Sequence, residues 1–238
     1  MKFTNLIKHL ETRADPVLAV LIDPDKFNPG LIKMANELNV TCFLVGGSRL
    51  EKGNLETTIK TIKRISKKPL VLFPGDETQL SSRADGLLLP VLVSGRNPEY
   101  LVGKQVLMAP KIKKMKLPCC PMAYLLIQGK RTSATQKITG TLPMAGSKHR
   151  EVCNTALASY YMGYKLLYLE AGSGAKSQVP AGLIKSVRKA VNLPLIVGGG
   201  IDSAIKAKKA VNAGANMVVV GNALEKDPGL LQSISKVF

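Results

Sequence analysis

The segment KLLYLEAGSGA, residues 165–175, begins as an apolar run and ends as a glycine-rich turn, with the carboxylate of Glu170 at the junction. A continuous apolar run is typical of a parallel strand covered by helices, whereas a half-exposed strand alternates. In a parallel barrel, the residues that follow the carboxyl ends of the strands form the active site. Other runs of this kind, and the residues behind them, therefore predict both the fold and its site.

Eight such runs alternate with segments of helical periodicity. They are residues 17–22, 41–47, 69–75, 86–94, 120–127, 165–172, 194–200 and 217–222. Strand–helix alternation with short connections indicates βαβ units. Eight units in 238 residues favour an α/β fold of the (β/α)₈ TIM barrel type over an open doubly wound sheet. No linker divides the chain, so we predict one barrel domain over 1–238, with residues 1–14 as an amphipathic N-terminal helix that packs on it.

Two connections differ from this pattern. The segment after the third run is a weak helix former, which predicts an irregular third βα unit. The segment 128–148 is long for a structureless connection and rich in basic residues. Such length is typical of loops that carry function or bind a partner, and this is the expectation for 128–148.

The chain is strongly basic, with 34 Lys and Arg against 16 Asp and Glu and a net charge of +18. Aromatic residues make up only 5% and Trp is absent, which argues against stacking on nucleic acid. A solvated basic surface is the first interpretation, and attraction to an anionic membrane or substrate is the second. No apolar run approaches the ~20 residues of a membrane span, and the N-terminus lacks the features of a signal peptide. We therefore expect a cytoplasmic protein with peripheral contact to a membrane as a further option.

The sequence offers little support for catalysis or metal binding by cysteine or histidine. The four cysteines form no CxxC pair, and both histidines fall in or at helical segments. Buried, reduced thiols are the simplest interpretation, and neither a zinc site nor a histidine-based triad is expected.

Glycine groups follow the sixth, seventh and eighth runs, at 172–174, 198–200 and 221. Glycine lets the backbone approach a ligand closely, and successive backbone N–H groups can then form a concave site for a phosphate. The loops after strands seven and eight are the usual phosphate site of such barrels. The alternative is that these glycines only make tight turns, which three successive loops make less attractive.

Two carboxylates stand directly behind strands. Asp23 suits a hard cation such as Mg²⁺, with the hydroxyl of Ser48 as a second ligand or a diphosphate contact. Glu170, beside the expected phosphate loops, suits a general base. The alternatives are an N-cap or salt bridge for Asp23 and an ion pair with a basic residue for Glu170.

Seven motifs, in this order, resemble the geranylgeranylglyceryl phosphate synthase family. They are LIDPDK (21–26), LVGGS (44–48), LFPG (72–75), PMAYLLI (121–127), YLEAGSGA (168–175), VGGGI (197–201) and VVGN (219–222). The resemblance implies a TIM-barrel enzyme of ether-lipid biosynthesis. With Mg²⁺, the family transfers a prenyl group from a prenyl diphosphate to the 3-hydroxyl of sn-glycerol 1-phosphate.

The resemblance also implies roles for individual residues. Asp23 and Ser48 would bind Mg²⁺, and Glu170 would take the proton of the attacking hydroxyl. The residues expected to contact glycerol 1-phosphate are Tyr168, Leu169, Glu170, Ala171, Gly172, Ser173, Gly174, Gly199, Gly200, Gly221 and Asn222.

The motif LIDPDK also suggests a subgroup. A bacterial branch that makes longer prenyl ethers has lysine where this chain has Leu21, so the chain is similar to the branch with archaeal and Bacteroidetes-like members, which are usually homo-oligomers, dimers or hexamers. Geranylgeranyl is the expected prenyl group, and heptaprenyl or another chain length is the alternative.

Two rival functions remain at this point. A barrel isomerase or aldolase for sugar phosphates would share the phosphate loops, but it needs an acid–base pair or a lysine at a strand end, and Lys26 falls beyond the first strand. A non-catalytic module that binds phosphorylated ligands or nucleic acid is the other rival.

Overall fold

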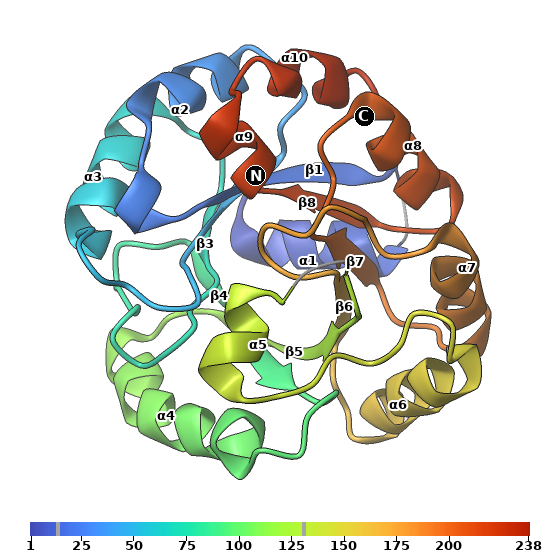
Figure 1. Ribbon diagram of the computed structural model, residues 1–238. Coiled ribbons are helices and arrows are strands. Elements are labelled where there is room, and N and C mark those ends of the chain that lie inside the picture. The colour runs from blue at the N-terminus through green and yellow to red at the C-terminus, as the bar shows by residue number, and fades with distance from the viewer. Residues whose placement is uncertain (13–14, 130–131) are drawn as a thin grey trace.

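The computed structural model describes residues 1–12, 15–129 and 132–238. Eight strands close into a parallel barrel in chain order, ringed by helices (Figure 1). The strands are β1 (Val17–Ile22), β2 (Cys42–Val45), β3 (Leu70–Leu72), β4 (Gly86–Leu92), β5 (Cys119–Leu126), β6 (Leu166–Glu170), β7 (Leu195–Gly198) and β8 (Met217–Val220). The barrel closes where β8 pairs with β1, with Val17 opposite Met217. The predicted TIM barrel is confirmed.

Helices follow most strands. They are α1 (Phe3–Thr12), α2 (Pro29–Asn36), α3 (Leu55–Ile65), α4 (Lys104–Met115), α5 (Ala134–Thr139), α6 (His149–Tyr161), α7 (Ala181–Ala190), α8 (Ala204–Asn212), α9 (Asn222–Lys226) and α10 (Leu230–Ser235), with a 3₁₀ turn η1 (Pro24–Lys26) and a π turn η2 (Glu99–Gly103). Residues 73–85, between β3 and β4, contain no helix. The third βα unit is therefore irregular, as its polar sequence predicted.

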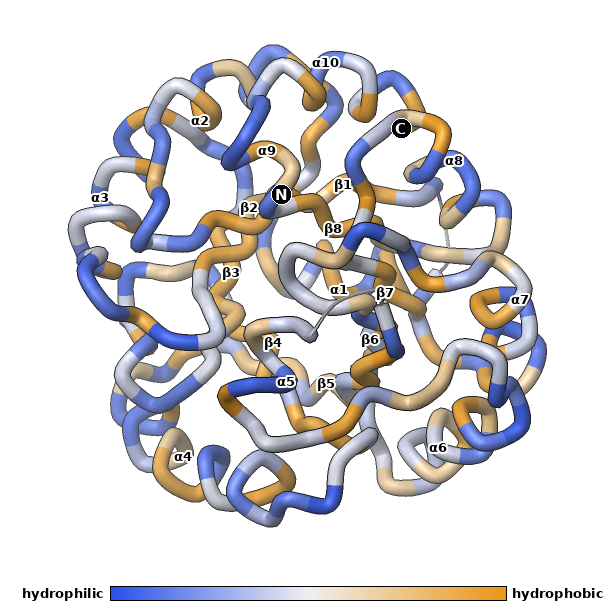
Figure 2. Tube along the Cα trace, in the orientation of Figure 1, coloured by the Kyte–Doolittle hydropathy of each residue, from blue (hydrophilic) through white to orange (hydrophobic). Residues whose placement is uncertain are grey.

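The core has two layers because successive residues of a strand point to opposite faces. In β6, Leu167 and Leu169 pack outward against the helices, whereas Leu166 and Tyr168 point into the barrel. Continuous apolar strands and helices of mixed hydropathy are visible in Figure 2. The strands are apolar on both faces because both are covered.

Helix α1 closes the amino-terminal end of the barrel. Its residues Phe3, Leu6 and Leu10 are buried with the inward-facing strand residues, and in Figure 1 the helix lies behind the strands. A Cβ on Gly86 would collide with the Phe3 ring, so the first residue of β4 has to be small. The N-terminal helix, expected over residues 1–14, spans Phe3–Thr12, and residues 13–14 lie outside the described part.

The segment 128–148 is more ordered than the expected loop. Helix α5 lies within it, and the Ser133 hydroxyl caps the helix by accepting the N–H of Gln136 at 3.1 Å. A parallel bridge joins Ile127 to Met144. A helix of six residues is too short to show a periodicity, which is why the sequence indicated only a loop. Residues 130–131 of this segment lie outside the described part.

Within the described ranges, no helix is both long enough and apolar enough to span a bilayer.

Candidate active site

A cavity of about 780 Å³ opens at the carboxyl ends of the strands. Its wall includes residues at or just behind the ends of β1, β4, β6 and β7, among them Asp23, Leu92, Glu170 and Gly199. The volume lies within the usual range for small-molecule sites, about 300–1,000 Å³. Residues that are far apart in the sequence are therefore gathered at the end of the barrel where the fold places its chemistry.

The loops after β6, β7 and β8 line one side of this cavity with backbone. We call Gly174, Gly199, Gly200 and Gly221 the glycine rim, since all four line the cavity. Gly199 has φ +77°, and a Cβ there would collide with the Glu170 carboxylate. Only glycine fits this position, both for its backbone conformation and for its close approach to the carboxylate.

Asn222 ties two of these loops together. It begins α9 directly behind β8, and its Oδ1 accepts the Ser173 hydroxyl at 2.6 Å and the Gly174 N–H at 3.0 Å. Ser173 and Asn222 both line the cavity. The loop behind β6 is thus held against the end of β8 by one amide oxygen.

Not every predicted contact residue lines the cavity. Tyr168 and Glu170 do, but Leu169 and Ala171 pack outward in the layer between strands and helices. Gly172 uses its backbone N–H to donate a hydrogen bond of 2.8 Å to Oε1 of Glu170. Alternation along β6 therefore separates the expected segment 168–174 into residues that line the cavity and residues that support them.

Glu170 ends β6 as a buried carboxylate, with 7% of its surface exposed. Burial raises the pKa of Glu170 to about 7, although Tyr168 and the Gly172 N–H both favour the charged form. Among the described residues, the Tyr168 hydroxyl has no well-formed hydrogen bond, so its effect on Glu170 is one of proximity. A carboxylate with a pKa near neutrality is suited to accept a proton during a reaction.

Three aromatic rings form a cluster beneath Glu170. Tyr124 and Tyr168 stack with centroids 5.2 Å apart, and Phe73 lies 5.5 Å from Tyr168. All three line the cavity. Burial raises the pKa of both tyrosines well above the usual value, so both stay neutral.

Asp23, directly behind β1, presents one carboxylate oxygen to the cavity. Its Oδ1 caps η1 by accepting the Asp25 N–H at 3.0 Å, while the nearest cation to Oδ2 among the described residues is the Lys26 ammonium, at 3.9 Å. Burial raises the pKa of Asp23, because the partly buried carboxylate is poorly hydrated when it is charged. Ser48 lines the same cavity from the loop behind β2.

This donor set fits Mg²⁺. The described residues contain no group of three or more His, Cys, Asp or Glu side chains arranged for a metal. One carboxylate and one hydroxyl, both oxygen ligands, are what Mg²⁺ uses when waters and substrate phosphates complete its shell. Asp25 has a structural role, since it accepts the backbone N–H groups of Glu51, Lys52 and Gly53.

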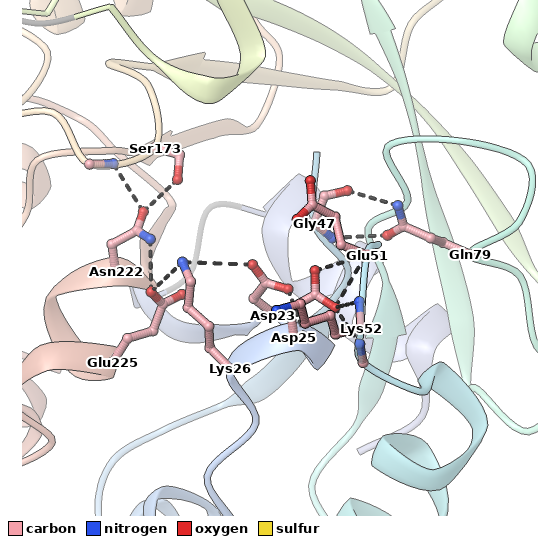
Figure 3. A network of polar contacts seen from close by, with 12 residues as sticks. Asp23, Asp25, Lys26, Gly47, Glu51, Lys52, Gln79, Ser173, Asn222 and Glu225 are labelled. Atoms are coloured by element: carbon pink, nitrogen blue, oxygen red, sulfur yellow. Dashed lines mark hydrogen bonds and ion pairs between the residues drawn. The ribbon is translucent and has the colours of Figure 1, made fainter. Parts of the chain in front are cut away.

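A polar network links these groups, and sequence reasoning missed part of it (Figure 3). Glu225 accepts hydrogen bonds from Lys26 at 3.0 Å and from Asn222 at 2.9 Å. Gln79 exchanges two hydrogen bonds of 2.9 Å with the backbone of Gly47 and so fixes the loop behind β2. Neither Glu225 nor Gln79 belongs to one of the seven motifs, so no sequence pattern marks them.

The opposite side of the cavity is lined mainly by apolar side chains. We call Leu92, Tyr100, Met108 and Ile138 the apolar half, and they come from β4, η2, α4 and α5. The Tyr100 hydroxyl donates to the Ile138 carbonyl at 3.2 Å, which fastens α5 over the opening. Sequence reasoning missed these four residues, because none of them belongs to one of the seven motifs.

Comparison with known proteins identifies the family. The model of the PcrB family matches residues 10–238. A geranylgeranylglyceryl phosphate synthase of Spirosoma linguale is 44% identical over 223 residues, covering 92% of this chain and 90% of that protein. The chain belongs to the PcrB family, with the geranylgeranylglyceryl phosphate synthases. The Pyrococcus furiosus synthase is 37% identical and covers 92% of this chain and 88% of its own length.

A solved structure of the family has the same architecture. The (S)-3-O-geranylgeranylglyceryl phosphate synthase of Thermoplasma acidophilum, in complex with its substrate sn-glycerol-1-phosphate, superposes with a TM-score of 0.91 at 28% identity. The match covers all of this chain and 98% of that one. The family resemblance drawn from the seven motifs is confirmed, and the roles of single residues in this PcrB-family chain remain predictions.

Proposed function

We propose that this chain is a Mg²⁺-dependent prenyltransferase that joins a geranylgeranyl group to the 3-hydroxyl of sn-glycerol 1-phosphate, forming geranylgeranylglyceryl phosphate and diphosphate for ether-lipid biosynthesis. The carrying observation is Glu170, a buried carboxylate with a pKa of about 7 that stands between a glycine-lined wall and an apolar one. One wall suits a phosphate and the other a hydrocarbon, and the proton acceptor lies where the two substrates would meet. The names of the relatives point to the same reaction.

The glycine rim would hold the phosphate of glycerol 1-phosphate. Backbone N–H groups at glycines with positive φ form concave anion sites, and Gly174, Gly199 and Gly200 have this conformation. With the phosphate there, the glycerol hydroxyl at the far end would reach Glu170. Binding in this way makes the attack effectively unimolecular.

The chemical step is transfer of the prenyl group to the 3-hydroxyl of glycerol 1-phosphate. The 3-hydroxyl oxygen forms a bond to the allylic carbon, the bond from that carbon to the diphosphate oxygen breaks, and its electron pair leaves with the diphosphate. Glu170 takes the hydroxyl proton. The rings of Phe73, Tyr124 and Tyr168 line the cavity here and exclude water from an allylic carbon that becomes positive.

Asp23 and Ser48 would hold Mg²⁺, which supplies charge neutralisation for the leaving diphosphate. Arg49 and Lys52 also line the cavity and would contribute positive charge on this side. The apolar half would take the prenyl tail. Its four side chains are uncharged, so a hydrocarbon can displace water from them at a gain of about 25 cal/mol per Å² buried.

The test is incubation of the protein with labelled sn-glycerol 1-phosphate and prenyl diphosphates of increasing length, with Mg²⁺ or with EDTA. We expect a butanol-extractable ether that depends on Mg²⁺ and is greatest with geranylgeranyl diphosphate. No extractable product with any chain length would refute the proposal. Preference for a heptaprenyl donor would keep the reaction and change the substrate, and equal use of glycerol 3-phosphate would contradict the stereochemistry.

The rival isomerase or aldolase lacks its lysine. None of the eight strands, all in the described part, ends in lysine, and Lys26 is ion-paired in η1. A Schiff base at a strand end therefore has no candidate residue.

We also propose a cytoplasmic enzyme that contacts an anionic membrane. The net charge of +18 favours an anionic surface, and Val102, Val106 and Leu142 are 56%, 62% and 78% exposed. The test is sedimentation with vesicles of phosphatidylglycerol or of phosphatidylcholine, and equal binding to both would contradict the proposal. A homo-oligomer, dimer or hexamer, is expected by family resemblance and is measured by light scattering.

A further inference from the structure

Lys26 lies between two carboxylates that belong to different parts of the cavity (Figure 3). Its ammonium is 3.0 Å from Oε2 of Glu225 and 3.9 Å from Oδ2 of Asp23. The two carboxylate side chains are 17% and 24% exposed, and the lysine is 53% exposed. The lysine is therefore bonded to Glu225 and stands just outside hydrogen-bond distance of Asp23.

This asymmetry matters because Oδ2 is the Asp23 oxygen that is more open to a ligand. Oδ1 accepts the N–H of Asp25 at 3.0 Å, which leaves Oδ2 as the oxygen without a hydrogen bond. An ammonium that moved about 1 Å closer would bond to Oδ2 and compete there with a divalent cation. The lysine side chain is flexible enough for this movement, so another group has to hold it away.

Glu225 is that group, and the same oxygen has a second contact. Its Oε2 also accepts the Nδ2 of Asn222 at 2.9 Å. This contact orients the amide so that its oxygen faces Ser173 and Gly174. One carboxylate oxygen thus touches both the lysine beside Asp23 and the amide that holds the loop behind β6.

We propose that Glu225 is a positioning residue that keeps the Lys26 ammonium off Asp23, leaving Asp23 open to the divalent cation, and that orients Asn222 toward the phosphate loop. The inference rests on the proposed function, because that function assigns Asp23 to the metal. It adds a residue outside the seven family motifs to the site. It also links the diphosphate side of the cavity to the glycerol phosphate side through a single side chain.

The alternative is that the Lys26–Glu225 pair only fastens η1 to α9. Exposed ion pairs contribute about 0–1 kcal/mol to folding, and a purely structural pair should change stability without changing metal binding. A double-mutant cycle separates the two roles. It compares the effect of removing the Glu225 carboxylate when the Lys26 ammonium is present and when it is absent.

The experiment measures binding rather than turnover. Titration calorimetry follows inorganic diphosphate binding at increasing Mg²⁺, and the Mg²⁺ concentration at half-maximal binding is compared among variants. Glu225→Gln removes the charge that holds Lys26, so we expect it to raise this concentration about fivefold. In a Lys26→Met background, Glu225→Gln should change the Mg²⁺ concentration at half-maximal binding less than about twofold, because no ammonium is left to compete with the cation.

A second titration tests the link to Asn222, with sn-glycerol 1-phosphate and no metal. Glutamine keeps a carbonyl oxygen that can accept from Asn222, so Glu225→Gln should bind glycerol 1-phosphate as the unaltered protein does. Glu225→Ala lacks any acceptor and should bind it about threefold more weakly. Lys26→Met should leave this affinity unchanged.

The matched control is Glu56→Gln, which breaks the surface pair between Glu56 and Arg83, 3.2 Å apart and away from the cavity. It should alter neither titration. If Glu225→Gln leaves the Mg²⁺ requirement unchanged, or raises it equally with and without Lys26, the positioning role is wrong. If the unaltered protein binds neither diphosphate with Mg²⁺ nor glycerol 1-phosphate, the proposed function itself fails.

Discussion

The glycine rim and the apolar half face each other across one cavity and are built in different ways. The rim consists of backbone at the ends of three consecutive strands, β6, β7 and β8, and its conformation requires glycine at Gly199. The apolar half consists of side chains from β4, η2, α4 and α5. Backbone held by a closed barrel has few ways to move, whereas side chains on short helices can adjust.

This difference matches the ligand proposed for each side. A phosphate is small and charged, and it needs donors at fixed positions. A hydrocarbon tail needs only apolar volume, which several combinations of side chains can supply. We therefore expect changes at the rim or at Glu170 to slow the reaction with every substrate, and changes in the apolar half to alter which substrate is accepted.

Glu170→Gln is expected to have the largest effect. Glutamine keeps an oxygen for the Gly172 N–H, which donates at 2.8 Å, but it cannot take a proton. A positioned general base contributes about 10²–10⁴-fold, so kcat should fall about a thousandfold, measured with geranylgeranyl diphosphate at saturating Mg²⁺. Glu151→Gln, on the surface of α6, is the control and should be fully active. A fully active Glu170→Gln variant would remove the base from the mechanism.

The same variant should be more stable at high pH. Burial raises the pKa of Glu170 from 4.5 to about 7, so its contribution to stability is fully present below about pH 4.5 and is lost as the pH rises through 7. At pH 8, Glu170→Gln should increase the free energy of unfolding by about 3 kcal/mol, measured by urea denaturation. At pH 5 the two proteins should differ little, and an equal difference at both pH values would contradict the shifted pKa.

The pH profile of kcat gives the next largest effect. In the proposed mechanism the active form of Glu170 is the carboxylate, and burial raises its pKa to about 7. The rate should therefore rise about fiftyfold between pH 5 and pH 7 and level off above about pH 8. Solvent-exposed carboxylates titrate near pH 4 and would give a flat profile over this range.

Gly199→Ala should break the rim. The alanine Cβ would strain a backbone at φ +77° and collide with Glu170. Together these should cost about 2 kcal/mol of stability and lower kcat/KM about 30-fold. Gly163→Ala is a matched control, because Gly163 has φ +85° but open space around its Cβ position. It should cost about 1 kcal/mol in unfolding and leave kcat/KM unchanged.

Ile138→Trp should give the smallest effect and a different kind of effect. Ile138 lines the apolar half, and an indole there would take up volume that a long tail needs. We expect kcat/KM for geranylgeranyl diphosphate to fall about tenfold and that for geranyl diphosphate to stay the same. Leu142→Trp, on an exposed residue outside the cavity wall, is the control. An equal loss of kcat/KM with geranylgeranyl and geranyl diphosphate would contradict the expectation that the apolar half selects the substrate.

The sequence predicted the rim better than the apolar half, for a physical reason. Apolar strands and the glycines behind them follow local rules, so 165–175 and its counterparts indicated the barrel and the phosphate loops. The residues Tyr100 and Ile138 come together only through the packing of η2 and α5, and a six-residue helix leaves no periodic pattern. Glu225 was missed because its role depends on contacts with Lys26, 199 residues away in the chain.

Helix α1 has a consequence for the order of events. It fills the amino-terminal end of the barrel with Phe3, Leu6 and Leu10, and in the described part of the chain the cavity opens at the other end. In the proposed reaction, two substrates and two products would share this opening. With the substrates bound as proposed, the one that arrives second would cover the first. The lipid product would reach into both halves and would have to leave before the next glycerol phosphate could bind.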